Sequence, residues 1–150
     1  MSTDIGFTEP VFTIGIVAKL LNISPESIRL YERQHLILPY KTKTDRRLFS
    51  KMDIEWIQCF RQYINRNLLK IKDIIHYLAQ FPCYETQRCS GSTKKQCLVY
   101  NNPNQICWAS INCPNRKPER IYCRECEVYK HICTLKSLPF KNTAQPTHIN

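Results

Sequence analysis

Cysteine is the residue type whose number and spacing in this sequence could do chemistry. The chain has 150 residues and nine cysteines, and eight of these lie between positions 83 and 133. They follow a pattern that occurs twice: a cysteine and an aromatic residue, four further residues and a second cysteine, then a spacer and the motif Cys-x-Val-Tyr. The second copy also contains Cys123-x-x-Cys126. A repeated pattern predicts two similar structural units that pack together.

This spacing is suited to binding a metal ion or an iron–sulfur cluster. A Cys-x-x-Cys pair places two sulfurs on one ion with little strain, and four thiolates suit either tetrahedral zinc or a cubane cluster. Spacing alone does not decide between the two. The second copy supplies four thiols, whereas the first supplies three and would take Cys133 as its fourth ligand, with His131 or water as substitutes. The candidate metal ligands are Cys83, Cys89, Cys97, Cys107, Cys113, Cys123, Cys126 and Cys133.

Two other uses of the cysteines stay open. The thiols could form disulfides as a redox switch, although cytosolic disulfides are usually transient and the first ten residues show no secretory signal. They could also be reduced structural cysteines without a ligand, but residues 83–133 contain few large aliphatic side chains from which to build a core. We therefore expect metal or cluster binding to fold residues 82–133. The ninth cysteine, Cys59, is predicted to be buried in a helical core.

Composition limits the classes of protein that the chain can belong to. It has 22 Lys and Arg against 12 Asp and Glu, a formal net charge of +10, which favours a polyanionic partner. No apolar run approaches the roughly 18 residues that a membrane span needs. We therefore expect a cytoplasmic protein without membrane association. Residues 1–11 are predicted to be a flexible N-terminus, and residues 134–150 a disordered tail.

Residues 12–81 carry the helical periodicity that the cysteine-rich segment lacks. Apolar residues at positions i, i+3, i+4 and i+7 form one stripe that begins at Ile14 and another that begins at Ile71. A wider stripe begins at Ile54. Pro82 ends the predicted helix that begins at Ile71, because proline disfavours helix in the residue before it. The pattern predicts a small helical domain.

Two of the predicted helices form a helix-turn-helix over residues 14–33. A three-residue turn joins them, and Ser24-Pro25 is typical of an N-cap followed by the first helical residue. In this geometry the second helix enters the major groove of DNA with its N-terminal residues near the base edges. A basic hairpin, or wing, is predicted over residues 38–49, and Ser50 with Asp53 predicts a capping box at the next helix.

A resemblance to the MerR-type winged helix-turn-helix is carried by the runs FTIGIVAKLLNISPESIRLYERQHLILP, DRRLFSKMDIEWIQCFRQY and NLLKIKDIIHYL. The resemblance implies that residues 12–81 bind double-stranded promoter DNA as a dimer, with RNA polymerase as a partner. It assigns DNA contacts to Arg29, Tyr31 and Arg47, whereas Glu32 is expected to orient an arginine. Polar residues of the second helix and basic residues of the wing extend this set. The candidate DNA-binding residues are Thr13, Ser24, Ser27, Arg29, Tyr31, Arg33, Lys41, Lys43, Arg46 and Arg47.

The chain departs from the MerR-type pattern after the fourth helix. That family usually continues into a long dimerisation helix, but here Phe81-Pro82-Cys83 interrupts the chain. Dimer contacts would then come from the cysteine-rich half, or be absent. That half is similar to the bacterial modules called two-CW segments, with Tyr84 in place of a tryptophan. The predicted fold is mainly α: a winged helix-turn-helix domain followed by a small, metal-stabilised cysteine-rich module.

The leading hypothesis is a transcription regulator whose cysteine-rich module senses a metal or the redox state. The alternative is a DNA-binding architectural or excision-type accessory factor with purely structural zinc, whose DNA affinity would not respond to redox poise. We do not expect an enzyme. The Cys123-x-x-Cys126 motif lacks the βαβ context of a thiol oxidoreductase, and no Ser/His/acid set or carboxylate pair is present.

Overall fold

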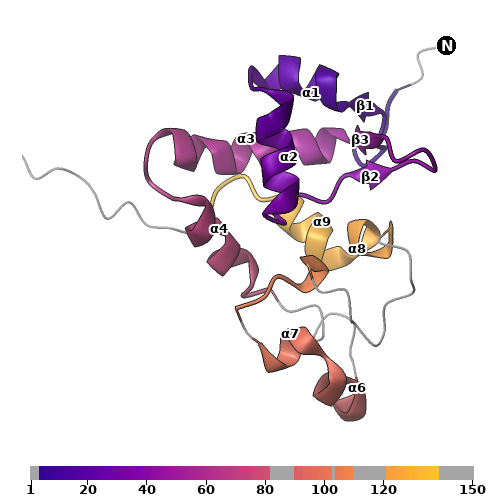
Figure 1. Ribbon diagram of the computed structural model, residues 1–150, viewed down its shortest axis with the longest axis vertical. Helices are drawn as coiled ribbons and strands as arrows, with labels where there is room; N and C mark the ends of the chain where they lie inside the picture. Colours follow the sequence, from indigo (N-terminus) through magenta and orange to yellow (C-terminus); the bar gives the residue numbers. More distant parts are fainter. Residues whose placement is uncertain (1–3, 82–89, 103, 110–120, 139–150) are drawn as a thin grey trace, which may run out of the picture.

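The computed structural model describes residues 4–81, 90–102, 104–109 and 121–138. In its first part the elements are β1 (Phe12–Thr13), α1 (Ile14–Leu21), α2 (Pro25–Arg33), β2 (Tyr40–Lys41), β3 (Arg47–Phe49), α3 (Lys51–Asn65) and α4 (Ile71–Leu78). In the rest they are α6 (Gly91–Gln96), α7 (Leu98–Asn101), the 3-10 turn η1 (Cys107–Ala109), α8 (Ile121–Glu125) and α9 (Glu127–Cys133). Figure 1 shows α8 and α9 next to the N-terminal elements, with α6 and α7 at the far end of the molecule.

The helix-turn-helix forms as the sequence predicts. Asn22 ends α1 in the left-handed conformation at φ 52°, which asparagine tolerates better than most residues. The Ser24 hydroxyl caps α2 by accepting a hydrogen bond from the backbone N–H of Ser27 at 3.1 Å, and Pro25 occupies the first turn. Buried Val17 and Ile28 pack the two helices onto the core.

The wing is a short antiparallel hairpin that belongs to a three-stranded sheet with the order β1-β3-β2. Asp45 turns the hairpin at φ 61°, and its N–H donates to the carbonyl of Thr42 at 2.9 Å. The strand β1 pairs Phe12 with Phe49, and it was not predicted because two residues are too few to show an alternating pattern. The sheet therefore joins the wing to the start of α1.

The predicted capping box at the start of α3 is confirmed. The Asp53 N–H donates to the Ser50 hydroxyl oxygen at 3.2 Å, and the Asp53 carboxylate accepts from the Ser50 N–H at 2.7 Å. Both residues are fully buried, which is unusual for a carboxylate in the first turn of a helix. A buried carboxylate needs a cationic partner, and that partner comes from the C-terminal half.

The two halves of the described chain share one hydrophobic core. Val128, Tyr129 and Ile132 of α9 belong to the same cluster as Trp56 and Phe60 of α3. This differs from the expectation that the cysteine-rich segment lacks an ordinary core. The described apolar side chains of η1 and α9 complete the core that residues 12–81 begin.

Parts of both ends that are predicted to be flexible contact α3. Residues 4–11 are held to α3, because Phe7 accepts a hydrogen bond from the Met52 N–H at 3.0 Å and Ile5 accepts one from the Lys51 ammonium at 2.8 Å. At the other end, residues 134–138 follow α9 along α3, where Leu138 is buried and its N–H donates to the Tyr63 hydroxyl at 2.9 Å. Residues 1–3 and 139–150 lie outside the described chain.

Helices in the described C-terminal residues are short. The longest after α4 is α9, with seven residues, so the described part of the chain contains no counterpart of a long dimerisation helix. None of the described helices has both the length and the apolar character that crossing a membrane requires.

Candidate nucleic-acid interface

The exposed face of α2 carries two arginines around one carboxylate. Arg33 donates to Glu26 at 2.8 Å, and Arg29 lies 3.6 Å from the same carboxylate. The hydrogen bond from Arg33 lowers the pKa of the Glu26 carboxyl, so that this group stays charged. Arg29 and Arg33 remain 43% and 58% exposed. Both guanidinium groups are therefore oriented by the helix surface and still available to a ligand.

Glu32 connects α2 to the wing, and it orients an arginine as predicted. The Glu32 side chain is only 16% exposed, and it accepts a short hydrogen bond from Arg47 of β3. Lys41 of β2 lies 3.5 Å from the other oxygen of the same carboxylate. The exposed Asp45 adds an ion pair with Lys41 at 3.6 Å. Glu32 thus fixes the cations of the wing relative to α2.

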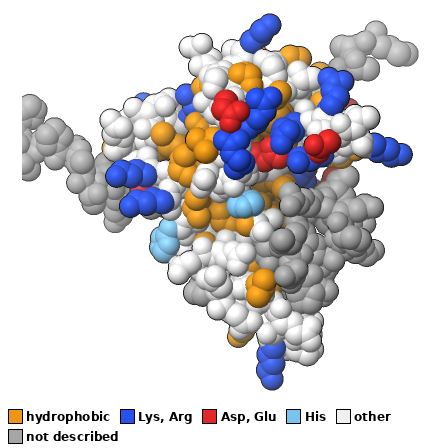
Figure 2. Space-filling model, viewed as in Figure 1, with side chains coloured by type: hydrophobic (Ala, Val, Ile, Leu, Met, Phe, Trp, Pro, Cys, Tyr) orange, Lys and Arg blue, Asp and Glu red, His pale blue; other side chains and the backbone are white. Residues whose placement is uncertain are grey.

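A cleft of about 600 Å³ lies between α2 and the wing. Figure 2 shows Lys and Arg side chains gathered over these elements with a few acidic side chains among them. Six side chains that line the cleft are cationic and one, Glu32, is anionic, so the cleft suits an anionic ligand. The cationic side chains are Arg29, Arg33, Lys41, Lys43, Arg47 and Arg124.

The end of α2 is held by one tryptophan from each half of the chain. His35 takes a positive φ of 60°, and the Leu36 N–H donates back to Tyr31 at 3.0 Å, which closes the helix in a Schellman motif. The Trp56 indole N–H donates to the Leu36 carbonyl at 2.8 Å, and the Trp108 indole N–H donates to the His35 carbonyl at 2.8 Å. These contacts fix the position of the last turn of α2.

Five of the ten predicted DNA-binding residues line the surface of the cleft: Arg29, Arg33, Lys41, Lys43 and Arg47. Ser24 is exposed and Ser27 half-buried at the start of α2, and Lys43 and Arg46 are exposed in the wing. Thr13 is half-buried at the N-terminus of α1, where it pairs with Leu48 of the sheet.

Tyr31 does not lie on that surface. Its ring is 7% exposed and packs edge-on against Phe60 at 5.0 Å between ring centroids. The prediction of a DNA contact for Tyr31 is therefore not supported by its position in the described structure, because the apolar stripe of α2 turns this ring into the core.

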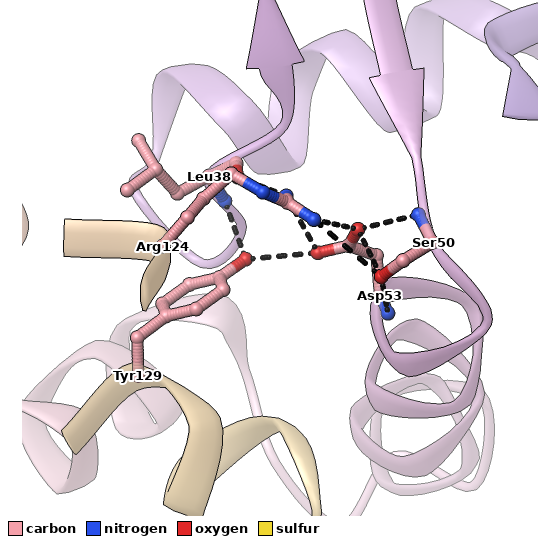
Figure 3. A network of polar contacts seen from close by, with 5 residues as sticks. All are labelled: Leu38, Ser50, Asp53, Arg124 and Tyr129. Carbon is pink, nitrogen blue, oxygen red and sulfur yellow. Dashed lines mark hydrogen bonds and ion pairs between the residues drawn. The ribbon is translucent and has the colours of Figure 1, made fainter. Parts of the chain in front are cut away.

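A polar network behind the cleft was not predicted from the sequence. Figure 3 shows Arg124 of α8 and Tyr129 of α9 pointing at Asp53 and at the backbone of Leu38. Arg124 is 7% exposed and pairs with the fully buried Asp53 at 2.8 Å. The Tyr129 hydroxyl accepts from the Leu38 N–H at 2.8 Å and donates to Asp53 at 3.2 Å. Burial raises the pKa of Tyr129 well above its usual range, so the hydroxyl keeps its proton.

The predicted metal ligands are only partly within the described chain. Cys83, Cys89 and Cys113 lie outside it. Cys97 is buried, and three others pack half-buried against the shared core: Cys107, Cys123 and Cys126. Among the described residues, no three Cys, His, Asp or Glu side chains are grouped so that they could hold a metal ion.

Cys133 and Cys59 are core residues. Cys133 is 1% exposed, and burial raises the pKa of its thiol well above the usual range. A bound metal ion deprotonates its thiol ligands, so the role of Cys133 as a fourth ligand stays a prediction. Cys59 is 6% exposed, and burial likewise raises the pKa of its thiol, as expected for the buried helical cysteine predicted from the sequence.

Residues 12–80 match the family described as MerR HTH family regulatory protein. Over 66 residues the chain is 41% identical to the HTH-type transcriptional regulator GlnR of Bacillus anthracis and to that of Bacillus cereus. The alignment covers 44% of this chain and 43% of each relative, so the chain spans less than half the length of the curated relatives it matches. No solved structure matches the chain.

The MerR-type match confirms the resemblance for the first half of the chain. The matched family consists of regulatory proteins, in agreement with the prediction that the chain is not an enzyme. The match ends at residue 80, before the cysteine-rich half, so the likeness of that half to two-CW segments stays a prediction.

Proposed function

We propose that the protein is a transcription regulator that binds double-stranded DNA sequence-specifically. In this proposal α2 enters the major groove and the wing contacts the adjacent phosphate backbone. The observation that supports it best is the contact of Glu32 with Lys41 and Arg47, which holds these two wing cations beside the arginines of α2 around one cationic cleft. The match of residues 12–80 to the MerR-type regulatory family supports the same function.

Removing either Arg29 or Arg47 is expected to weaken DNA binding. Each full-length Ala variant should lose about 1–3 kcal/mol of binding free energy, because a guanidinium contact to a base edge or phosphate is deleted. The rest of each ion-pair group survives, since Glu26 keeps Arg33 and Glu32 keeps Lys41. The measurement is fluorescence anisotropy at fixed salt, on a duplex selected from a random-sequence library with the wild-type protein.

The control for this prediction is Lys95→Ala. Lys95 is exposed on α6, at the far end of the molecule from α2 (Figure 1), so the variant removes one positive charge without touching the cleft. Its affinity should equal that of the wild type. Equal losses in all three variants would mean that binding follows net charge only. Failure of the selection to enrich any sequence would contradict sequence-specific binding.

Dimerisation and RNA polymerase also belong to this proposal. A two-fold dimer fits the symmetric half-sites that helix-turn-helix proteins read. The described part of the chain has no long helix for the interface, so we propose that the cysteine-rich half supplies it. RNA polymerase as a partner is supported by the family resemblance alone.

We further propose that the cysteine-rich half binds zinc or an iron–sulfur cluster and senses metal or redox state. The repeated spacing supports this, above all the second copy with Cys107, Cys113, Cys123 and Cys126. Three of these four are half-buried near the core, and the fourth lies outside the described residues. Four thiolates on one ion or cluster would order a segment whose own apolar content is low.

The metal proposal predicts a stoichiometric metal in protein purified without oxygen. Elemental analysis and an absorbance spectrum distinguish colourless zinc protein from brown iron–sulfur protein. The double variant Cys123→Ala/Cys126→Ala should lose the metal, because two of its four thiolates are gone. Cys59→Ala is the matched control and should retain it, since Cys59 is buried in α3. Metal-free wild-type protein whose nine thiols are all reduced would contradict the proposal.

A further inference from the structure

One guanidinium group holds both ends of the wing. Leu38 stands just before β2, and Ser50 directly follows β3. Arg124 Nη1 donates to the Leu38 carbonyl at 2.6 Å, and Arg124 Nη2 lies 3.4 Å from the Ser50 hydroxyl (Figure 3). Arg124 comes from α8, 86 residues further along the chain than Leu38. The wing is therefore anchored by a residue outside the segment that matches the MerR-type family.

The anchor is rigid because Asp53 locks the fork of Arg124. Nη1 lies 3.1 Å from one carboxylate oxygen, and Nη2 lies 2.8 Å from the other. Arginine presents its donors in a fixed planar arrangement, so a two-point pair with a carboxylate sets its orientation. Tyr129 also holds this pair in place, because its hydroxyl accepts from the Leu38 N–H and donates to Asp53.

Apart from Arg124, the wing is fixed by the pairing of β3 with β1 and by its contacts with α2. Its strands β2 and β3 contain two and three residues. Short strands make few ladder hydrogen bonds, so their position depends on the segments at their ends. On the ligand side, the wing reaches α2 through Arg47 and Lys41, which meet Glu32. A displacement of Leu38 or Ser50 would therefore move the two cations that the wing presents beside α2.

We infer that Arg124 is a positioning residue for DNA binding. It holds the wing at the distance from α2 that DNA binding requires. The inference rests on the proposed DNA-binding function. DNA affinity thereby depends on a folded α8–α9 segment, although this segment lies outside the helix-turn-helix. A purely structural Arg124 would stabilise the fold without any specific effect on the wing cations, and the experiment separates these two roles.

The experiment uses full-length Arg124→Lys, which keeps the positive charge beside Asp53 but loses the planar fork. Hydrogen exchange read by mass spectrometry should be about 10-fold faster in peptides covering residues 38–49 and unchanged in peptides covering residues 14–33. On the selected duplex, DNA affinity should fall about 5-fold or more. Tyr129→Phe, which removes only the hydroxyl, should shift both readouts in the same direction by less, and it serves if Arg124→Lys does not fold.

A double-mutant cycle with Arg47→Ala tests the route through the wing. Arg124→Lys should cost less affinity when Arg47 is already absent, because one of the two cations that it positions is gone. The matched control is Lys136→Ala, which removes another C-terminal ion pair to α3, with Glu55 at 2.9 Å, that does not touch the wing. It should change neither exchange nor affinity.

Two results would overturn the inference: unchanged exchange in residues 38–49 of Arg124→Lys, or affinity losses that simply add in the cycle. A selection that enriches no duplex would count against the proposed function instead. In that case the exchange measurement still decides whether Arg124 positions the wing.

Discussion

Replacing Asp53 by Ala is expected to lower the free energy of unfolding by about 3–5 kcal/mol, the usual loss when one partner of a buried ion pair is removed. The change strands the Arg124 guanidinium, which is 7% exposed and would keep only the Leu38 carbonyl and the Ser50 hydroxyl as partners. It also opens the capping box of α3, because the Ser50 N–H loses its acceptor. Urea denaturation of the full-length protein measures the loss.

The chain supplies a matched control in Asp73. This residue occupies the same third position of α4, and its carboxylate accepts from the Lys70 N–H at 2.8 Å. Asp73 is only half-buried, however, and it has no arginine partner among the described residues. Asp73→Ala should therefore cost only the cap, about 0.5–2 kcal/mol. Equal losses in the two variants would show that the pair with Arg124 adds nothing to the cap.

The parts of the fold that could be predicted are those with local causes. Ser24, Ser50 and Asp53 form the predicted caps because a cap depends on residues within three positions of each other. Glu32 was expected to orient an arginine, and the structure shows that this arginine is Arg47 of the wing. The match of residues 12–80 to the MerR-type family agrees with the helix-turn-helix predicted from these local patterns.

The parts that could not be predicted depend on contacts distant in sequence. Nothing near Arg124 indicates that its partner is Asp53, 71 positions earlier, or that Tyr129 caps the backbone of Leu38. Tyr31 was placed on the DNA-facing surface because its type matched the family, whereas the helical period turns it into the core against Phe60. The contact with Phe60 is not visible in the local sequence, because the two residues belong to different segments.

The position of Arg124 gives the proposed sensing a physical path. Cys123 and Cys126 flank it in sequence, so any change that repositions these two thiols acts on the helix that carries the anchor of the wing. No long chain of contacts is required, because Arg124 itself reaches Leu38 and Ser50. A cysteine-rich half that is docked in this way can regulate DNA binding without a separate linker or domain movement.

Replacing Trp108 by Ala is expected to cost about 3–5 kcal/mol of stability, the usual range for removing a buried tryptophan side chain. The ring is 4% exposed, packs edge-on against Tyr129 at 5.1 Å between centroids, and donates to the His35 carbonyl at the end of α2. The chain has two tryptophans, so Trp56 is the sole indole in this variant. Its fluorescence during urea denaturation reports on the core of residues 12–81.

Trp108→Phe is the matched variant, because it keeps most of the ring against Tyr129 and removes the N–H bond to His35. It should cost about 1 kcal/mol, the net worth of one hydrogen bond. Since the two halves share one core, Trp56 fluorescence should report the loss in Trp108→Ala at full size. If the Trp56 transition stays at the wild-type urea concentration, the C-terminal half unfolds independently, and it cannot be the support on which the recognition helix and the wing depend.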